Sequence, residues 1–260
     1  MQQFILTLDC DWAPDFVIES TLAKIEQAGA HATVFVTHPS KSIPSRLVSQ
    51  SIELGWHPNF HANSTQGRSV PDVVAYLENI VPHAQSVRTH DLFQSTSIFS
   101  QLIKSAPRLR NDCSLYLPGQ KHISPFDLQL ENQIVLRRFP FLWEDDLHLV
   151  AKPSFGSRDQ EYGNADEKMA MRFKDIPTQG LCMLNFHPIH VYLNTLDFSS
   201  YRKVQALGPL TTLTESDLKP YVNLGKGIAT LFDQALSELD FSQHLAEFAA
   251  ADSSGRTHSA

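Results

Sequence analysis

The stretch "LTLDCDWAPD" (residues 6–15) places two carboxylates at the end of an apolar run. Residues 4–8 have the pattern of a short buried strand, in which side chains two residues apart point to the same face. Asp9 and Asp11 therefore share one face, and Cys10 points to the other. A turn or a helix cap explains a single aspartate. Two anions on one face repel each other unless a cation, a proton or an arginine lies between them, so the pair indicates a metal or acid–base site.

Strand-like and helix-like segments alternate along the rest of the chain. The apolar periodicity predicts strands at 31–37, 86–90, 109–116, 134–141 and 180–189, and helices at 16–28, 45–54, 70–81, 92–104 and from 228 to about 239. Such alternation predicts an α/β fold with a parallel sheet, either a barrel or a doubly wound sheet. Several polar groups follow strand ends, where barrel enzymes place their active sites, so we favour the barrel. We expect one domain over 1–250 and a disordered tail over 251–260.

Composition restricts the function. The 260 residues are 42% hydrophobic and carry a net charge of −7, which predicts a soluble domain without a basic surface. We therefore expect no nucleic acid among its partners. The cysteines Cys10, Cys113 and Cys182 lack C-x-x-C spacing, which argues against a disulfide framework and favours a reducing compartment, the cytoplasm. No run approaches about 18 apolar residues, so we expect no membrane span.

Two histidines four residues apart stand in "ELGWHPNFHANS" (residues 53–64). On a helical turn His57 and His61 would share one face, a spacing suited to metal capture. Pro58 can occupy the first position of such a turn, with His57 as its cap. The chain has twelve histidines, so one such spacing arises readily by chance. Each of the two is equally compatible with a hydrogen-bonded surface group.

The order of these polar segments resembles the polysaccharide deacetylases of carbohydrate esterase family 4, the NodB homology domain. "TLDCD" (7–11) is similar to the first family motif with one residue inserted, and "ELGWHPNFH" (53–61) resembles the second. "VRTHD" (87–91) looks like a reduced third motif, and "LNFHPIH" (184–190) resembles the fifth. The order matches over about residues 4–190. The resemblance implies a distorted or incomplete (β/α)7-type barrel.

The resemblance also implies roles for individual residues. The metal ligands would be Asp11, His57 and His61, and the ion one divalent metal, preferably zinc, with cobalt, nickel or manganese as alternatives. Asp9 would be the general base and Arg88 would keep it ionised and oriented. His187 would be the general acid, with His190 as its rival. The fourth motif falls in "FLWEDD" (141–146), and the candidates for a supporting role are Trp143, Asp145 and His90.

The activity implied is the hydrolysis of an N-acyl group, acetyl in the family, from a carbohydrate or a sugar-containing intermediate, such as one of surface polysaccharide biosynthesis. Asn185 stands where the family has a leucine that shapes the acetyl pocket, so this departure concerns acyl specificity. Two alternatives are a catalytically silent carbohydrate-binding protein and an amidohydrolase of a small N-acylated metabolite. The presence of both Asp9 and His187 favours an enzyme. The sequence is compatible with a monomer or a homo-oligomer.

Overall fold

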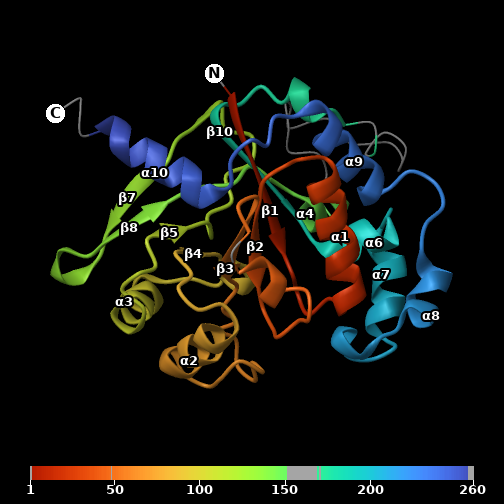
Figure 1. Cartoon of the computed structure of the whole chain (residues 1–260), viewed down its shortest axis with the longest axis horizontal. Helices are drawn as coiled ribbons and strands as arrows, with labels where there is room; N and C mark the ends of the chain where they lie inside the picture. The colour runs from red at the N-terminus through yellow and green to blue at the C-terminus, as the bar shows by residue number, and fades with distance from the viewer. Residues whose placement is uncertain (1, 48, 151–168, 170, 257–260) are drawn as a thin grey trace.

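One curled sheet of ten strands organises the described residues, 2–47, 49–150, 169 and 171–256, of this computed structural model (Figure 1). The strands are β1 (Gln2–Asp9), β2 (Ala32–Val36), β3 (Ile52–Trp56), β4 (Ser86–Val87), β5 (Asn111–Asp112), β6 (His122–Ile123), β7 (Phe126–Gln129), β8 (Val135–Arg138), β9 (Trp143–Glu144) and β10 (Gln179–Phe186). Their order is β6-β10-β1-β2-β3-β4-β5-β8-β7, and β9 also pairs with β10. Among the described strands, only β7 and β8 pair antiparallel. Within the described residues no pairing joins the two ends of this order, which confirms the predicted incomplete α/β barrel.

Helices connect the parallel strands. The α-helices are α1 (Asp15–Gln27), α2 (Val70–Ile80), α3 (Thr96–Ser105), α4 (Asp145–Val150), α6 (Pro188–Leu193), α7 (Phe198–Gln205), α8 (Glu215–Leu218), α9 (Ile228–Glu238) and α10 (Leu245–Arg256). Short 3-10 helices lie at η1 (Pro44–Arg46), η2 (His90–Leu92), η3 (Glu131–Gln133), η4 (Phe173–Asp175), η5 (Leu210–Thr212) and η6 (Lys219–Tyr221). None of the helices described here has the length and apolar character that a membrane crossing requires.

The two longest described strands, β1 and β10, lie side by side (Figure 1), and β10 and β1 are the second and third strands from the β6 end of the strand order. Thr7 of β1 is in register with Asn185 of β10, and Asn185 is in turn in register with Glu144 of β9. Because the strands are parallel, β1 and β10 end at the same edge, and Asp9 and His187 meet there. Residues 5–9 and 181–186 are buried throughout, so this pair of strands is a rigid base for whatever lies at its carboxyl ends.

The strand β1 ends at Asp9, and the chain then turns sharply. Asp11 and Trp12 have left-handed backbone conformations with φ values of 39° and 56°. The turn is fixed by hydrogen bonds from the backbone N–H of Ala13 to the Cys10 carbonyl and from that of Trp12 to the Thr37 hydroxyl. Asp11 therefore leaves the strand, and its carboxylate is directed by this turn rather than by the alternation predicted from Asp9.

The prediction of a helix over residues 45–54 is wrong. In the structure η1 covers Pro44–Arg46 only, and Ile52–Trp56 forms β3, which pairs in parallel with β2 and β4. The sequence ELGW is buried between two strands, and the tertiary pairing overrides the helical spacing of its apolar residues.

The C-terminal segment is helical further than the sequence indicates. The helix α10 continues to Arg256, so residues 251–256 of the tail expected to be disordered form regular structure, and residues 257–260 lie outside the described part of the chain. The Arg137 guanidinium of β8 reaches Asp252 at 2.7 Å, and the Ser253 hydroxyl donates to the Ala249 carbonyl. The Arg137–Asp252 ion pair attaches the last turns of the helix to the sheet, and the Ser253 bond lies within the helix.

Gly55 permits the close packing of Phe35, whose ring contacts the Arg88 guanidinium. A Cβ atom at this position would lie 2.8 Å from the Phe35 ring and 2.9 Å from the Ser86 carbonyl oxygen. The face of Phe35 in turn lies 4.7 Å from the Arg88 guanidinium. We predict that Gly55→Ala lowers the free energy of unfolding by about 1–3 kcal/mol, because the added methyl group overpacks the core. Urea denaturation measures the change.

The control is Gly225→Ala, where the nearest atom to an added Cβ is 3.5 Å away. This variant should unfold at the same urea concentration as the parent. A Gly55→Ala protein that is as stable as the Gly225→Ala protein would contradict the packing argument.

Candidate active site

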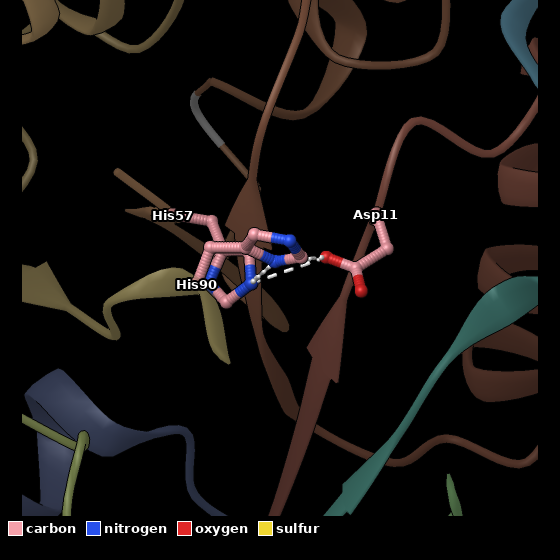
Figure 2. A group of neighbouring side chains, drawn as sticks. All are labelled: Asp11, His57 and His90. Carbon is pink, nitrogen blue, oxygen red and sulfur yellow. Dashed lines mark hydrogen bonds and ion pairs between the residues drawn. The ribbon is translucent and has the colours of Figure 1, made fainter. Parts of the chain in front are cut away.

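Three donor atoms from separate segments meet beyond the strand ends. Asp11 follows β1, His57 follows β3 and His90 begins η2 after β4 (Figure 2). The Asp11 Oδ1 atom lies 3.2 Å from His57 Nε2 and 3.2 Å from His90 Nδ1, and the two nitrogens are 3.4 Å apart. Ligands about 2.0–2.1 Å from a tetrahedral zinc ion are about 3.3 Å from each other. The triangle therefore has the dimensions of one face of a metal coordination sphere.

Hydrogen bonding around the triangle also fits a metal ion. The Nδ1 atom of His57 is 2.7 Å from the Arg88 carbonyl oxygen, so it carries the ring proton and leaves the Nε2 lone pair free. That lone pair faces the carboxylate of Asp11. The Asp11 Oδ1 atom is buried and receives no hydrogen bond of acceptable geometry from any described residue. Two facing lone pairs repel each other, and a cation between them removes the repulsion.

Asp9 lies next to this triangle, and its carboxylate accepts hydrogen bonds from two donors. The Arg88 guanidinium donates to Asp9 Oδ1 at 3.1 Å, and the side-chain amide of Asn185 donates to Asp9 Oδ2 at 2.9 Å. Arg88 also donates to the Thr7 hydroxyl and to the Asn185 amide oxygen. Asp9 is 2% exposed, and its carboxylate, fixed by these two donors, lies 3.9 Å from His57 Nε2. This is suitable geometry for a proton acceptor beside a metal site.

His187 occupies the other side of the same cavity. Its Nδ1 atom lies 2.6 Å from Asp145 Oδ1, and its backbone N–H donates to Asp145 Oδ2 at 2.8 Å. Burial alone would lower the pKa of the imidazole, but the carboxylates of Asp145, Asp146 and Asp11 raise it well above its ordinary value. The Nε2 atom lies 3.5 Å from Asp11 Oδ2. The imidazole of His187 is thus directed at the triangle of Asp11, His57 and His90, and its surroundings favour the protonated form.

His190 is placed differently from His187. Its Nδ1 atom lies 3.1 Å from the Thr195 hydroxyl, and its ring packs 4.6 Å from Tyr201. Burial and the charge of His187 lower the pKa of His190 to about 3. A neutral histidine has no proton to donate at neutral pH, so the geometry favours His187 as the acid.

Of the three supporting candidates, Asp145 and His90 contact the centre and Trp143 does not. Asp145 fixes His187 as described above, and His90 is part of the triangle. Trp143 is 1% exposed and packs on Phe186 and Phe173, with ring centroids 4.9 and 5.0 Å away. It is a core residue of β9 that packs against β10.

His61 lies outside the triangle. Its Nε2 atom is 3.0 Å from Asp91 Oδ2, and its ring centroid is 6.2 Å from that of His90. The segment after His57 is irregular rather than helical, and an Asn59 side-chain oxygen accepts from the His61 backbone N–H. Pro58 thus starts no helical turn, and the spacing of four residues does not bring the two imidazoles together.

Two acidic residues complete the cavity and were not singled out from the sequence. Glu144 accepts a hydrogen bond from Asn185 at 2.9 Å and lies 3.9 Å from His187 Nε2. Burial, with the charge of Asp146, raises the pKa of Glu144 well above its ordinary value. Asp146 Oδ1 is buried without a hydrogen-bond partner among the described residues. The sequence signal for these two residues is the acidic run 144–146, but such a run fits a solvated turn equally well.

These groups surround a cavity of about 160 Å³. Its lining includes residues of the triangle, the Asp9 carboxylate, the His187 imidazole and the apolar side chains of Leu92 and Leu147. A proton acceptor, a proton donor and a metal-sized triangle therefore face one small space. This arrangement can activate a water molecule, stabilise a developing oxyanion and protonate a leaving group.

Comparison with known proteins agrees with this chemistry. The sequence profile of the family described as WbmS-like polysaccharide deacetylase matches residues 6–205. A crystal structure from Bordetella bronchiseptica, of a candidate polysaccharide deacetylase described as involved in O-antigen biosynthesis, is 30% identical, with a TM-score of 0.69 over 90% of each chain. A candidate polysaccharide deacetylase from Mycobacterium smegmatis is 13% identical over 92% of each chain, with a TM-score of 0.50, and shows the fold alone. No curated protein sequence matches significantly. The chain belongs to the WbmS-like family of polysaccharide deacetylases.

Proposed function

We propose that this protein is a metal-dependent hydrolase that removes an N-acyl group, acetyl in the first instance, from a carbohydrate. The observation that carries the proposal is the convergence of three groups on one 160 Å³ cavity. They are the triangle of Asp11, His57 and His90, the carboxylate of Asp9 and the imidazole of His187. Membership of a polysaccharide deacetylase family supports the reaction class.

In this proposal Asp11, His57 and His90 hold one divalent ion, preferably zinc, and His61 is not a ligand. One carboxylate and two imidazoles are donors that suit zinc, cobalt or nickel. The chemistry such an ion supplies when bound is Lewis-acid activation of water and of the acyl carbonyl. The arginine-bound Asp9 keeps its own charge and remains available for a proton.

The residues of the chain then divide the proton transfers between them. Asp9 accepts a proton from the attacking water, and Arg88 and Asn185 keep its carboxylate oriented during the transfer. His187 donates a proton to the departing amine, while Asp145 keeps the imidazole in place and protonated. An amine requires such protonation because its anion is a very poor leaving group.

We further propose a place in surface polysaccharide biosynthesis, and in the cytoplasm. The Bordetella bronchiseptica relative, described as involved in O-antigen biosynthesis, supports the first point. Cys10, Cys113 and Cys182 are all buried and unpaired, which is usual in a reducing compartment and supports the second.

The metal ligands are tested by two histidine variants. We predict that His90→Ala lowers the zinc content of protein purified without chelator by at least about tenfold, because it removes one corner of the triangle. His61→Ala is the matched control, since this histidine lies on the same side of the site but outside the triangle, and it should keep its metal. Elemental analysis of both proteins gives the answer. Loss of metal from His61→Ala and retention by His90→Ala would reverse the assignment.

The proton acceptor is tested by Asp9→Asn. The amide retains the shape of the carboxylate but cannot take the proton, so acetate release should fall by about 10²–10⁴-fold. The zinc content should remain at the parent level, because Asp9 is not a corner of the triangle. Full activity, or loss of the metal together with activity, would show that Asp9 has another role.

The proton donor is tested by the pH dependence of kcat. A histidine donates a proton only while it is protonated, that is, below its pKa. The carboxylates around His187 raise this pKa, so the alkaline limb of the profile should lie above the ordinary range of histidine. Asp145→Asn removes one of these charges and should shift the alkaline limb to lower pH. An alkaline limb that does not move would assign it to a different group.

A further inference from the structure

The segment after β2 lies between the two strands that lead to Asp11 and His57. The strand β2 pairs with β1 on one side and with β3 on the other, and all three are parallel. Thr37 and His38 follow β2 directly, and both residues are buried. Neither lines the 160 Å³ cavity, so neither has a part in the proton transfers proposed above. Their polar groups instead contact the segments that carry two of the proposed metal ligands.

Thr37 and His38 together bind both ends of the Trp12–Ala13 segment. The backbone N–H of Trp12 donates to the Thr37 hydroxyl oxygen at 3.1 Å. His38 Nδ1 lies 2.8 Å from the same hydroxyl, and His38 Nε2 lies 3.1 Å from the Ala13 carbonyl oxygen. A carbonyl only accepts, so Nε2 carries the ring proton, and burial lowers the pKa of His38, which favours the neutral ring. The Thr37 hydroxyl therefore donates to Nδ1, and each hydrogen bond in this chain has one donor and one acceptor.

This chain of hydrogen bonds holds a turn that the backbone does not favour by itself. Asp11 and Trp12 have left-handed backbone conformations, with φ values of 39° and 56°. In such a conformation the Cβ atom of a residue other than glycine crowds the following carbonyl oxygen. Because the local preference opposes the turn, the bonds from Thr37 and His38 maintain it, and with it the direction of the Asp11 carboxylate.

Gln66 connects Thr37 with the segment of His57. The buried side chain of Gln66 donates through Nε2 to the carbonyl oxygens of Thr37 and His57, at 2.8 and 3.0 Å. Its Oε1 atom accepts the backbone N–H of Asn59 at 2.6 Å. The amide thus uses both of its donor hydrogens and its acceptor oxygen. Thr37 therefore contacts the Asp11 turn through its hydroxyl group and the His57 segment through its carbonyl group.

We infer that Thr37, His38 and Gln66, here called the Thr37 clamp, are positioning residues that hold Asp11 and His57 at a metal-binding separation. The Asp11 Oδ1 and His57 Nε2 atoms are 3.2 Å apart. Two acceptor atoms at this distance repel each other when no ion lies between them, so an unsupported pair would separate. Ligands that are held in place before the ion arrives bind it more tightly. The inference rests on the proposed function for the ion, and it goes beyond that function by naming residues outside the cavity that set the ligand geometry.

The affinity for zinc tests the clamp. The metal-free parent protein and its Thr37→Val variant are titrated with zinc in competition with a chromophoric chelator. Valine keeps the shape of threonine and removes the hydroxyl group, so the dissociation constant for zinc should rise by about 10–100-fold. Thr37→Ser retains the hydroxyl group and should restore the parent affinity.

The matched control is Thr21→Val. Thr21 is a buried threonine of α1, and its hydroxyl group donates to the Val17 carbonyl within the same helix. This variant loses a buried hydrogen bond outside the clamp, so it should keep the parent affinity for zinc. A merely structural effect would lower the free energy of unfolding of both valine variants and leave zinc binding unchanged in both. That result, with a parent protein that binds zinc, would overturn the inference and retain the proposed function.

Gln66→Met tests the other half of the clamp. Methionine is similar in length to glutamine and leaves the carbonyl groups of Thr37 and His57 without their donor, so zinc binding should weaken by about 10–100-fold here as well. The two variants change different segments of the chain, so if one fails to fold, the other still gives the answer. Parent affinity for zinc in folded Gln66→Met protein would contradict the clamp.

Amide hydrogen exchange of the metal-free proteins, followed by NMR, tests the clamp without the ion. The backbone N–H of Trp12 loses its acceptor in Thr37→Val, and that of Asn59 loses its acceptor in Gln66→Met, so each should exchange faster than in the parent and in Thr21→Val. Unchanged exchange at both positions would overturn the inference. Faster exchange at both, in a protein whose parent binds no zinc, would retain the clamp and contradict the proposed metal site.

Discussion

The packing and hydrogen bonds of the buried Arg88 guanidinium are the interactions on which the rest of the structure depends. It is 0% exposed and is stacked between the rings of Phe35 and Phe141, at 4.7 and 4.6 Å from their centroids. A charge in such a place is costly unless all of its hydrogen bonds are made. Arg88 donates to the Cys113 carbonyl and to side chains of β1 and β10, among them the Asp9 carboxylate. One side chain thus connects the ends of strands that are far apart in the sequence.

The surroundings of Arg88 explain why this edge of the sheet needs further positive charge. The carboxylates gathered here are Asp9, Asp11, Glu144, Asp145 and Asp146, and a single guanidinium cannot balance them. Part of the imbalance is relieved by protons, since the pKa values of Glu144, Asp146 and His187 are all raised. The remaining unpaired oxygen of Asp11, facing two imidazoles, is the position where the proposed divalent cation would complete the charge balance. The electrostatics of the site and the proposed chemistry therefore have one origin.

Asn185 links the strands that meet at this edge of the sheet. Its amide accepts from Arg88 and Thr7 and donates to both Asp9 and Glu144, so every hydrogen bond it can make in this layer links two strands. A leucine at this position could make none of these contacts, and Glu144 would lose its partner. The polar residue thus holds the carboxylate of Asp9, the proposed proton acceptor.

The sequence predicted the parts of this structure that depend on local pattern. The alternation of strands and helices, the long strands around β1 and β10, and the placement of Asp9, Asp11, Arg88 and His187 at strand ends all follow from periodicity and motif order. It did not predict what depends on tertiary contacts. Sheet pairing makes Ile52–Trp56 a strand, and an irregular segment after His57 separates His61 from the site. The 3-10 helix η2 instead brings His90 to the site. Glu144 was missed because only its pairing with β10 reveals that it is buried.

The central claim is that Asp11, His57 and His90 hold a catalytic divalent ion. Anomalous X-ray diffraction from crystals grown with zinc, recorded on both sides of the zinc absorption edge, tests it most directly. The account predicts one strong anomalous peak in contact with Asp11 Oδ1, His57 Nε2 and His90 Nδ1. A peak bound by His61 and Asp91, a peak between Asp9, Glu144 and His187, or no peak at saturating zinc would contradict it.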